Sequence, residues 1–355
     1  MKSFIKALLV PIVSGVMITA AFAPSSAWAQ NRLIVQGGSP VPNPAYLNTY
    51  VAQQAGFFAE EGLDVEVRYT QGAALATQLA ASNNADIADV TFEPYLLGYS
   101  QGLRGKFIYS RYDELIYWIA VPVDSPIKTP ADLAGKTIGV ASMASSSLTV
   151  ARSILRDAGI KPTDKSFLPV GTGDQAIAAL RSGQVQALSL WDAVYGSLER
   201  AGHKFRYIYH PRVGNVGNGG FFVSEKTLAD KDAQLRGFLR AQVKARVFIK
   251  ENPEAALKMY WVANPAAKPQ SPEEEAIKKG MQEITFKSAF FNDDPVKDFG
   301  VFDLEKVGSY MDVLKKEGVY KADLTPSDLV TNTLIEAVND IDPAPVREMA
   351  DKWGK

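Results

Sequence analysis

Two carboxylates in this sequence each follow an aromatic residue. Glu93 follows Phe92, and Asp192 follows Trp191. A carboxylate accepts hydrogen bonds from an amine, an amidine or a ring N–H, and an aromatic ring stacks on a planar group or cages an ammonium. Because an unpaired buried charge is costly, each carboxylate needs such a donor if it faces a binding cleft. Glu93 precedes Pro94 and fits a solvated loop equally well.

Three consecutive serines, Ser145, Ser146 and Ser147, lie between a predicted strand and a predicted helix. A serine that caps a helix leaves backbone N–H groups and the positive end of the helix dipole at that point. A phosphate, sulfonate or carboxylate binds well there without a lysine or an arginine. The same serines cap the helix if no ligand binds, so their position is also compatible with a purely structural role.

Other polar and aromatic residues complete the candidate ligand-binding set. Thr172 lies in a Gly-Thr-Gly turn, Asn218 lies in a glycine-rich segment, and Ser39 follows the first predicted strand. The candidate rings are those of Tyr46, Phe92, Tyr95 and Trp191. Packing in the core of a lobe is the alternative role for at least one of these rings.

Enzyme chemistry has little support in the sequence. The chain has no cysteine and two histidines, His203 and His210, so thiolate chemistry is excluded and histidine chemistry is restricted. No nucleophile elbow, phosphate-binding loop or zinc motif is present, and we expect neither a metal nor a cofactor. The two histidines flank a predicted strand at 205–209, where we expect them on the surface.

The candidate residues need elements that bring them together, and the apolar pattern predicts strands that alternate with helices. The predicted strands are residues 33–35, 65–69, 86–92, 106–110, 137–141, 167–170 and 185–190. The predicted helices are residues 46–58, 75–80, 147–158 and 174–182, and the pattern beyond residue 231 is helical. This alternation predicts doubly wound sheets with parallel strands, because each crossover needs a helix to cover a sheet face.

An internal echo, a pattern that occurs twice in the sequence, places the pairs Phe92–Glu93 and Trp191–Asp192 at equivalent positions. Residues 82–95 and residues 182–195 each read as a helix end, a tight turn, a buried strand and then an aromatic residue beside a carboxylate. In open α/β sheets, ligands bind at the carboxyl ends of the strands. Such units look alike in any α/β protein, so the echo favours two similar lobes that face each other and does not identify a function.

Length and charge limit the function classes. The 355 residues are enough for two lobes of roughly 100–200 residues each. Hydrophobic residues make up 46% of the chain and charged residues 22%, as in ordinary globular proteins. The 38 basic and 39 acidic residues leave a net charge of −1, which argues against nucleic-acid binding through a broad basic face.

The first 29 residues are predicted to be an export signal that is cleaved after Ala29. Lys2 and Lys6 precede an uncharged, mostly apolar run at 7–23, and the sequence Ala-Trp-Ala follows at 27–29. A membrane anchor is the alternative, but the run is interrupted and falls short of the roughly 20 residues that cross a bilayer. We therefore expect a soluble, exported product whose folding does not rely on an oxidising compartment.

Several stretches of the chain carry a family resemblance. They are residues 55–65 (AGFFAEEGLDV), 132–140 (DLAGKTIGV), 145–147 (SSS), 178–185 (AALRSGQV) and 190–195 (LWDAVY). As a set they resemble the periplasmic solute-binding proteins of the nitrate/sulfonate/taurine and thiamine-precursor transporter family. The resemblance covers roughly residues 32–260. Ala193 stands where that family usually has proline. Ala144 stands where glycine is usual, and the family usually has a histidine near Leu148; these last two departures weaken a claim for an aliphatic sulfonate.

The resemblance implies a two-lobed α/β protein of the type II periplasmic-binding fold, with two doubly wound mixed sheets, a ligand cleft between the lobes and C-terminal helices. We expect lobe 1 at 30–120 plus 214–265 and lobe 2 at 121–213. The C-terminal helices at 266–355 should pack mainly on lobe 1. The chain should cross between lobes at 116–123 and return at 213–220, where glycines permit the backbone changes of a hinge.

The predicted function is the capture of a small organic anion or zwitterion by a monomeric periplasmic protein, which delivers it to an ABC permease and ATPase complex. An acidic ligand group is expected at the serine loop, and a donor or aromatic portion near Asp192 and Trp191. Taurine-like zwitterions and pyrimidine precursors of thiamine fit this arrangement better than nitrate does. Two alternatives remain, an enzyme that makes the thiamine pyrimidine with a reactive histidine in the cleft, and an exported sensor for a membrane receptor.

Overall fold

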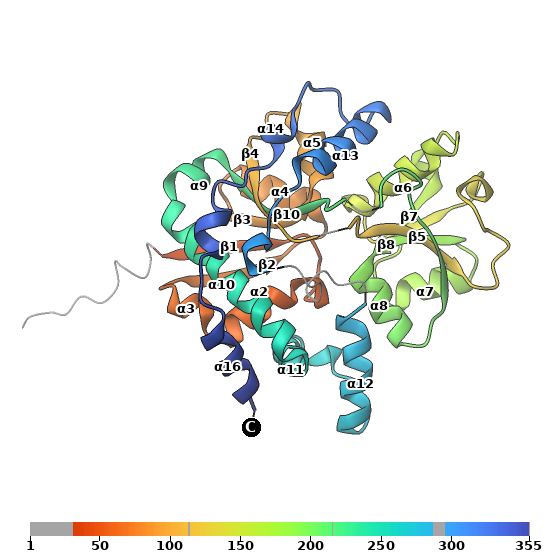
Figure 1. The fold of residues 1–355 in the computed structure, drawn as a ribbon. Helices are drawn as coiled ribbons and strands as arrows, with labels where there is room; N and C mark the ends of the chain where they lie inside the picture. The colour runs from red at the N-terminus through yellow and green to blue at the C-terminus, as the bar shows by residue number, and fades with distance from the viewer. Residues whose placement is uncertain (1–30, 113, 215, 287–294, 355) are drawn as a thin grey trace, which may run out of the picture.

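The computed structural model describes residues 31–112, 114–214, 216–286 and 295–354. Two five-stranded sheets, each covered by helices, form two lobes that lie side by side (Figure 1). The predicted export signal lies outside the described residues. Within the described part of the chain, no helix is both long enough and apolar enough to cross a membrane.

The sheet of lobe 1 has the strand order β2-β1-β3-β10-β4. Its strands are β1 (Arg32–Gly37), β2 (Asp64–Tyr69), β3 (Ile87–Thr91), β4 (Gly105–Ser110) and β10 (Gly219–Ser224). β1 pairs in parallel with β2 and with β3, whereas β10 is antiparallel to β3 and to β4. The parallel strands therefore end along one edge of the sheet.

The sheet of lobe 2 repeats this plan with the order β7-β6-β8-β5-β9. Its strands are β5 (Tyr117–Pro122), β6 (Ile138–Val140), β7 (Phe167–Pro169), β8 (Ala187–Trp191) and β9 (Phe205–Ile208). β6 pairs in parallel with β7 and β8, and β5 is antiparallel to β8 and β9. In each lobe, a strand next to the crossing between lobes is the one that runs antiparallel. The expected fold class, two doubly wound mixed sheets, is confirmed.

The internal echo marks equivalent units of the two lobes. In lobe 1, β3 leads directly into α5 (Phe92–Tyr99), and in lobe 2, β8 leads directly into α8 (Asp192–Arg200). The sequence analysis predicted no helix after either strand, so both helices were missed. Both are short, and each begins at the residue after the strand, so the strand pattern hides the start of the helix.

The crossings between the lobes differ from the prediction. Residues 116–123 were expected to carry the chain out of lobe 1, but Tyr117–Pro122 is β5, a strand paired on both sides within the second sheet. The outward crossing therefore lies between β4 and β5, at 111–116, and lobe 2 begins before residue 121. The return crossing lies between β9 and β10, at 209–218, and overlaps the predicted segment.

Helices cover both faces of each sheet. The helices before β10 are α2 (Leu47–Gln54), α3 (Phe57–Glu60), α4 (Ala73–Ala81), α5, α6 (Ser146–Asp157), α7 (Asp174–Arg181) and α8. The helices after β10 are α9 (Glu225–Asp230), α10 (Asp232–Glu251), α11 (Pro253–Ala263), α12 (Glu273–Ile284), α13 (Leu304–Lys316), α14 (Pro326–Leu329), α15 (Ile335–Asn339) and α16 (Ala344–Lys352). The single helix predicted at 46–58 is divided into α2 and α3 at Gly56, whose φ of +83° interrupts the helix.

The C-terminal helices do not all pack on lobe 1. α15 and α16 pack against α10, and α14 packs against β4. α12, however, packs against α8 of lobe 2 as well as against α11, and its Glu283 pairs with Arg200 of α8 at 2.6 Å. The hydroxyl of Ser197 on α8 also donates to Glu283, so polar contacts join α12 to α8. The expectation that the C-terminal helices pack mainly on lobe 1 is therefore wrong for α12.

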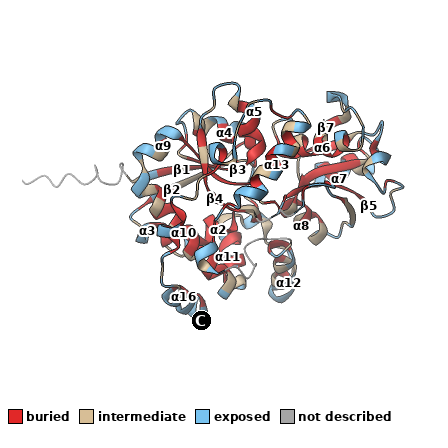
Figure 2. Cartoon of the chain, turned by 45° about the horizontal axis from the view of Figure 1, so that its top comes forward, coloured by how far each residue is buried: buried red, intermediate tan, exposed pale blue. Residues whose placement is uncertain are grey.

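Figure 2 shows buried residues along both sheets and on the inner sides of the helices that cover them. One apolar cluster contains β1, α2 and the buried face of α10. A second cluster extends from α4 and α5 of lobe 1 through the whole interior of lobe 2, and includes residues of α13. Packing is thus continuous across the junction between the lobes.

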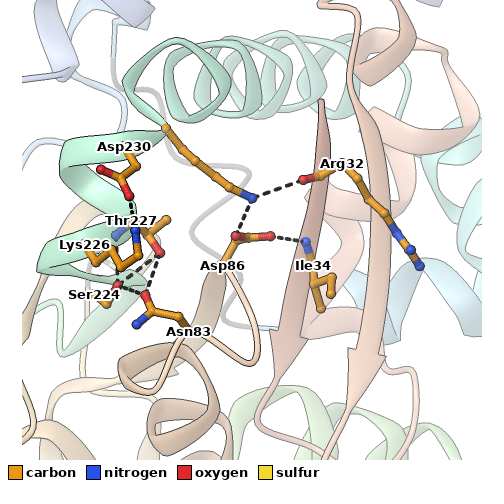
Figure 3. A network of polar contacts seen from close by, with 9 residues as sticks. Arg32, Ile34, Asn83, Asp86, Ser224, Lys226, Thr227 and Asp230 are labelled. Atoms are coloured by element: carbon orange, nitrogen blue, oxygen red, sulfur yellow. Dashed lines mark hydrogen bonds and ion pairs between the residues drawn. The ribbon is translucent and has the colours of Figure 1, made fainter. Parts of the chain in front are cut away.

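A polar network holds the start of β3 to the returning chain of lobe 1 (Figure 3). Asp86 accepts a hydrogen bond from the backbone N–H of Ile34 at 2.8 Å and pairs with Lys231 at 2.7 Å. Beside it, Ser224 donates to Asn83 at 2.6 Å and caps α9. These contacts fix β3, whose other end carries residues of the candidate site.

Candidate functional site

A cleft that is partly open to solvent lies at the carboxyl ends of strands from both sheets. Lobe 1 lines it with residues that follow β1 and β2 or end β3, and lobe 2 lines it with residues that follow β6 or end β8. The lining residues are Gly38, Ser39, Ala45, Tyr46, Ala73, Asp89, Val90, Thr91, Tyr112, Ile116, Tyr117, Ser145 and Trp191. Of the predicted site residues, Ser39, Tyr46, Ser145 and Trp191 are therefore brought together, as the echo and the strand ends indicated.

Two hydrogen bonds join the lobes beside this cleft. Ser142 of lobe 2 donates through its hydroxyl to the carbonyl of Gln71 in lobe 1 at 2.7 Å. The backbone N–H of Ala74 donates to the carbonyl of Ala144 at 3.3 Å. Gly72 lies between them with φ +143°, and a Cβ there would be 2.8 Å from the Ala144 oxygen. The lobes are thus in contact at this edge, and a side chain at residue 72 would hold them apart.

A buried ion pair lies at the lobe 1 wall of the cleft. Asp89 on β3 pairs with Arg111, the first residue after β4, and each side chain is no more than 2% exposed. Arg111 also donates to the carbonyl of Ala45, and the Tyr112 hydroxyl donates to Asp89 at 3.4 Å. Burial raises the pKa of Asp89 to about 6 despite the attraction of Arg111. Asp89 is therefore mostly ionised at neutral pH, and its two carboxylate oxygens accept from Arg111 and Tyr112.

Three phenols add donors around the same space. Burial raises the pKa of Tyr46 and of Tyr112, and the negative charge of Asp89 raises both further. Burial also raises the pKa of Tyr117, and the charge of Glu93 raises it further, while the neighbouring hydroxyls of Thr91 and Ser146 lower it. All three phenols therefore remain protonated and able to donate at physiological pH. Tyr117, between Thr91 of lobe 1 and Ser146 of lobe 2, lies where the two lobes meet.

The serine loop forms the start of α6, as predicted. Ser145 is the N-cap, and its hydroxyl accepts from the backbone N–H of Ser147 at 3.3 Å and lies 2.9 Å from the Ser147 hydroxyl. Ser145 lines the cleft, whereas Ser146 and Ser147 are buried beneath it. The capping role is confirmed by this geometry, and a ligand contact at this loop stays a prediction.

Phe92 lies in the core of lobe 1, not at the cleft. Its side chain is fully buried, and its ring lies 4.7 Å from that of Phe107 and 6.0 Å from that of Phe302. As the first residue of α5, it follows Thr91, and successive residues at this strand end point in different directions. Thr91 therefore takes the place at the cleft that was predicted for Phe92. Tyr95 is likewise buried in the core.

Glu93 and Asn218 form a buried pair behind the cleft wall. Asn218 donates to Glu93 at 3.1 Å, and the hydroxyl of Tyr310 on α13 donates to the same carboxylate oxygen. Burial raises the pKa of Glu93, although the hydroxyls of Thr91 and Tyr310 and the Asn218 amide lower it. The solvated-loop alternative for Glu93 is wrong, because the residue is fully buried. Neither Glu93 nor Asn218 is among the lining residues.

Two further predicted residues lie outside the lining. Asp192 begins α8, where its carboxylate accepts from the backbone N–H of Ala193 at 2.6 Å and its own N–H donates to the Ile116 carbonyl at 3.1 Å. Thr172 is half-buried in the loop before α7. Both lie on lobe 2, and a ligand contact for either stays a prediction.

His210 is buried, so the surface position predicted for it is wrong. Its side chain is 1% exposed and lies in a polar cluster with Ser153 and Glu317, away from the cleft lining. His203 is half-buried just before β9. Among the described residues that line the cleft there is no histidine, lysine or arginine.

The sequence analysis did not identify five residues at or beside the cleft, which are Asp89, Thr91, Arg111, Tyr112 and Tyr117. One signal was present, because Asp89 lies between the apolar residues Ala88 and Val90 in the middle of a segment that was predicted as a buried strand. A charged residue in such a strand requires a partner of opposite charge. Arg111, which directly follows the strand predicted at 106–110, was available for that role.

The model of the family described as "NMT1/THI5 like" matches residues 43–256. Two curated proteins are similar to the chain. The riboflavin-binding protein RibY of Chloroflexus aurantiacus is 24% identical over 67% of this chain and 70% of its own length. The formylaminopyrimidine-binding protein of Halalkalibacterium halodurans is 26% identical over 61% of this chain and 66% of its own length.

Solved structures share the fold. The alkanesulfonate-binding protein SsuA from Xanthomonas axonopodis pv. citri, bound to MOPS, superposes with a TM-score of 0.63 at 15% identity, over 85% of this chain and 99% of that one. The desulfurization enzyme DszB superposes with a TM-score of 0.54 at 16% identity, over 86% of this chain and 99% of that one. The fold therefore supports both binding and catalysis, and function has to be argued from the site.

The two mixed sheets, the cleft at their carboxyl ends and the match across residues 43–256 lead to one conclusion. The chain has the periplasmic-binding-protein fold and belongs to the NMT1/THI5-like family.

Proposed function

We propose that this protein is the solute-binding component of an ABC-type importer and that it encloses one small organic molecule between its lobes. The observation that carries the proposal is the shared cleft, to which both lobes contribute polar and aromatic side chains. A ligand that contacts both halves only when they are closed shifts the population toward the closed form.

The lining favours a planar, hydrogen-bonding ring over a simple sulfonate. Asp89 offers an acceptor for ring N–H or amino groups, the phenols and hydroxyls offer donors for ring nitrogens and carbonyls, and the Trp191 indole offers a surface for stacking. Arg111 is already paired with Asp89, so the wall of lobe 1 brings no net positive charge to the ligand. The names of the two curated relatives, a riboflavin binder and a formylaminopyrimidine binder, support the same ligand class.

The α6 N-terminus supports an additional acidic or carbonyl group on this ligand. Ser145 brings the positive end of the α6 dipole to the cleft, opposite the Asp89 wall. A pyrimidine-like molecule would then place its acceptor end at α6 and its donor end at Asp89. This arrangement moves the predicted carboxylate partner of the ligand from Asp192 to Asp89.

Export to the periplasm and delivery to a permease and ATPase complex remain part of the proposal. The predicted signal at residues 1–29 and the fold shared with periplasmic proteins support it. The enzyme alternative required a reactive histidine in the cleft, and neither His203 nor His210 is among the residues that line it.

The proposal is tested by thermal unfolding in the presence of riboflavin, a formylaminopyrimidine, taurine and an alkanesulfonate. A ligand that binds only the folded protein stabilises it by about 2.7 kcal/mol at a concentration of 100 times its Kd. We expect a rise in melting temperature with a ring compound and little change with the two sulfonates. Stabilisation by the sulfonates alone would contradict the ligand class, and conversion of a ring compound to product would contradict the binding function.

A further inference from the structure

Besides the two crossings, α13 connects the lobes. The chain on either side of this helix is bound to lobe 1, because the backbone N–H of Ser110 donates to the Gly300 carbonyl at 2.8 Å and that of Thr331 donates to the Phe107 carbonyl at 2.9 Å. The hydroxyl of Tyr310, within α13, donates to Glu93 of α5. The helix therefore moves with lobe 1.

The other end of α13 is held by lobe 2. Glu317, the C-cap residue directly after α13, has a side chain that is 5% exposed. One carboxylate oxygen accepts from the Ser153 hydroxyl on α6, and the other lies 2.7 Å from Arg212 Nη2 and 3.3 Å from His210 Nε2. Arg156 of α6 donates to the Glu317 carbonyl at 3.1 Å. Figure 1 shows α13 next to α6.

The partners of Glu317 lie on two parts of lobe 2, the return crossing and α6. His210 and Arg212 belong to the return crossing at 209–218, one of the two segments that join the lobes and the one where the sequence predicts a hinge. Ser153 lies on α6, whose first turn carries Ser145 into the cleft, about 12 Å away at 1.5 Å per residue. A single carboxylate fixed to lobe 1 thus holds both the hinge segment and the helix that lines the cleft.

The cluster contains a serine, a histidine and a glutamate, but its geometry does not suit a nucleophile. The backbone N–H of Arg212 donates to His210 Nδ1 at 3.2 Å, so a neutral His210 carries its proton on Nε2. That nitrogen lies 2.9 Å from the Ser153 hydroxyl and cannot accept its proton, as a general base must. The remaining role for these buried polar contacts is to set the position of the parts they join.

We propose that Glu317 is a positioning residue for lobe closure, which holds the return crossing and α6 against α13 in the orientation that the closed cleft requires. Burial alone would raise the pKa of Glu317, but hydrogen bonds from His210 and Ser153 and the charge of Arg212 keep it lowered. The carboxylate therefore stays ionised, and its contacts are charge-assisted, which makes them stronger than neutral hydrogen bonds. The effect of Glu317 on ligand affinity rests on the proposed function, whereas its effect on the orientation of the lobes does not.

The test measures the distance between the lobes without any ligand. The chain has no cysteine, so cysteines introduced at the exposed residues Gln78 of α4 and Gln175 of α7 are the sole sites for a pair of spin labels. Double electron–electron resonance then measures the distribution of distances between the two labels, and so between the lobes. Glu317→Gln and Ser153→Ala should each shift it toward longer or broader distances. Losing one charge-assisted contact should lower the closed-to-open ratio about tenfold.

Glu305→Gln is the matched control, because it makes the same change at an exposed position at the start of α13. A distribution in Glu317→Gln and Ser153→Ala equal to that of the control would overturn the proposal. So would a loss of thermal stability without any change in distance, since that is what a merely structural role predicts. If no compound in the ligand panel binds, these ligand-free distances still decide the inference, so its failure is distinct from failure of the proposed function.

Discussion

Replacing Arg111 by methionine is expected to lower the free energy of unfolding by about 3–5 kcal/mol, the usual effect of leaving one member of a buried ion pair without its partner. Asp89 and Arg111 are both almost fully buried, and methionine occupies a similar volume without a charge. Asp89 then has to be protonated or to remain charged without a counterion. Denaturant unfolding at neutral pH measures the difference.

The double variant Asp89→Leu with Arg111→Met separates stability from binding. Removing both charges takes away the unpaired group, so most of the lost stability should return. If Asp89 accepts ligand hydrogen bonds, the double variant should nevertheless fail to bind the ring compounds. Arg68→Met, which breaks an exposed pair with Glu66, serves as the control and should leave stability nearly unchanged. An effect of Arg111→Met no larger than this control would contradict the buried pair.

Replacing Trp191 by leucine is expected to weaken the binding of a ring ligand by roughly 10- to 100-fold, because stacking on an aromatic side chain contributes about 1–3 kcal/mol. Leucine keeps the position apolar, which limits the loss of packing at a side chain that is 7% exposed. Isothermal titration with the compound that stabilises the wild-type protein measures the change in Kd.

Trp191→Phe is the matched variant, since it keeps an aromatic face of smaller area. It should retain affinity within a few-fold of the wild type if stacking is the main contribution. Equal losses in the leucine and phenylalanine variants would show that the indole acts through its size or its N–H group. No loss in either would remove Trp191 from the binding site.

The fold could be predicted because local patterns determine it. Alternating apolar segments indicated most strands and helices of the two lobes, although β5, β10, α5 and α8 were missed, and the echo between residues 82–95 and 182–195 located equivalent units of the two lobes. The outward crossing was placed too late, because Tyr117–Pro122 is apolar on both faces and reads the same whether it crosses between lobes or completes a sheet. Only pairing with β8 and β9 distinguishes the two.

The site could be predicted in part, for a related reason. Ser145 and Trp191 lie at strand ends, and strand ends in this fold meet at the ligand cleft. Phe92 was assigned to the cleft from the same rule, but a position at a strand end does not say which of two neighbouring side chains points inward. Thr91 faces the cleft and Phe92 packs in the core.

The Asp89–Arg111 pair depends on contacts that the sequence does not reveal. The two residues come from β3 and from the end of β4, and β10, a strand that arrives only after the chain has passed through lobe 2, lies between those strands. The same is true of Glu317 and His210, which are far apart in the sequence and meet because α13 spans the lobes. Long-range polar pairs of this kind need the tertiary structure.

The most direct measurement is a crystal structure of the protein with the ring compound that stabilises it. The ligand should lie in the cleft, with a donor group within hydrogen-bond distance of Asp89 on one lobe and its ring against Trp191 on the other. A ligand that is found outside this cleft, or that touches one lobe alone, would contradict the claim that the two halves hold it together.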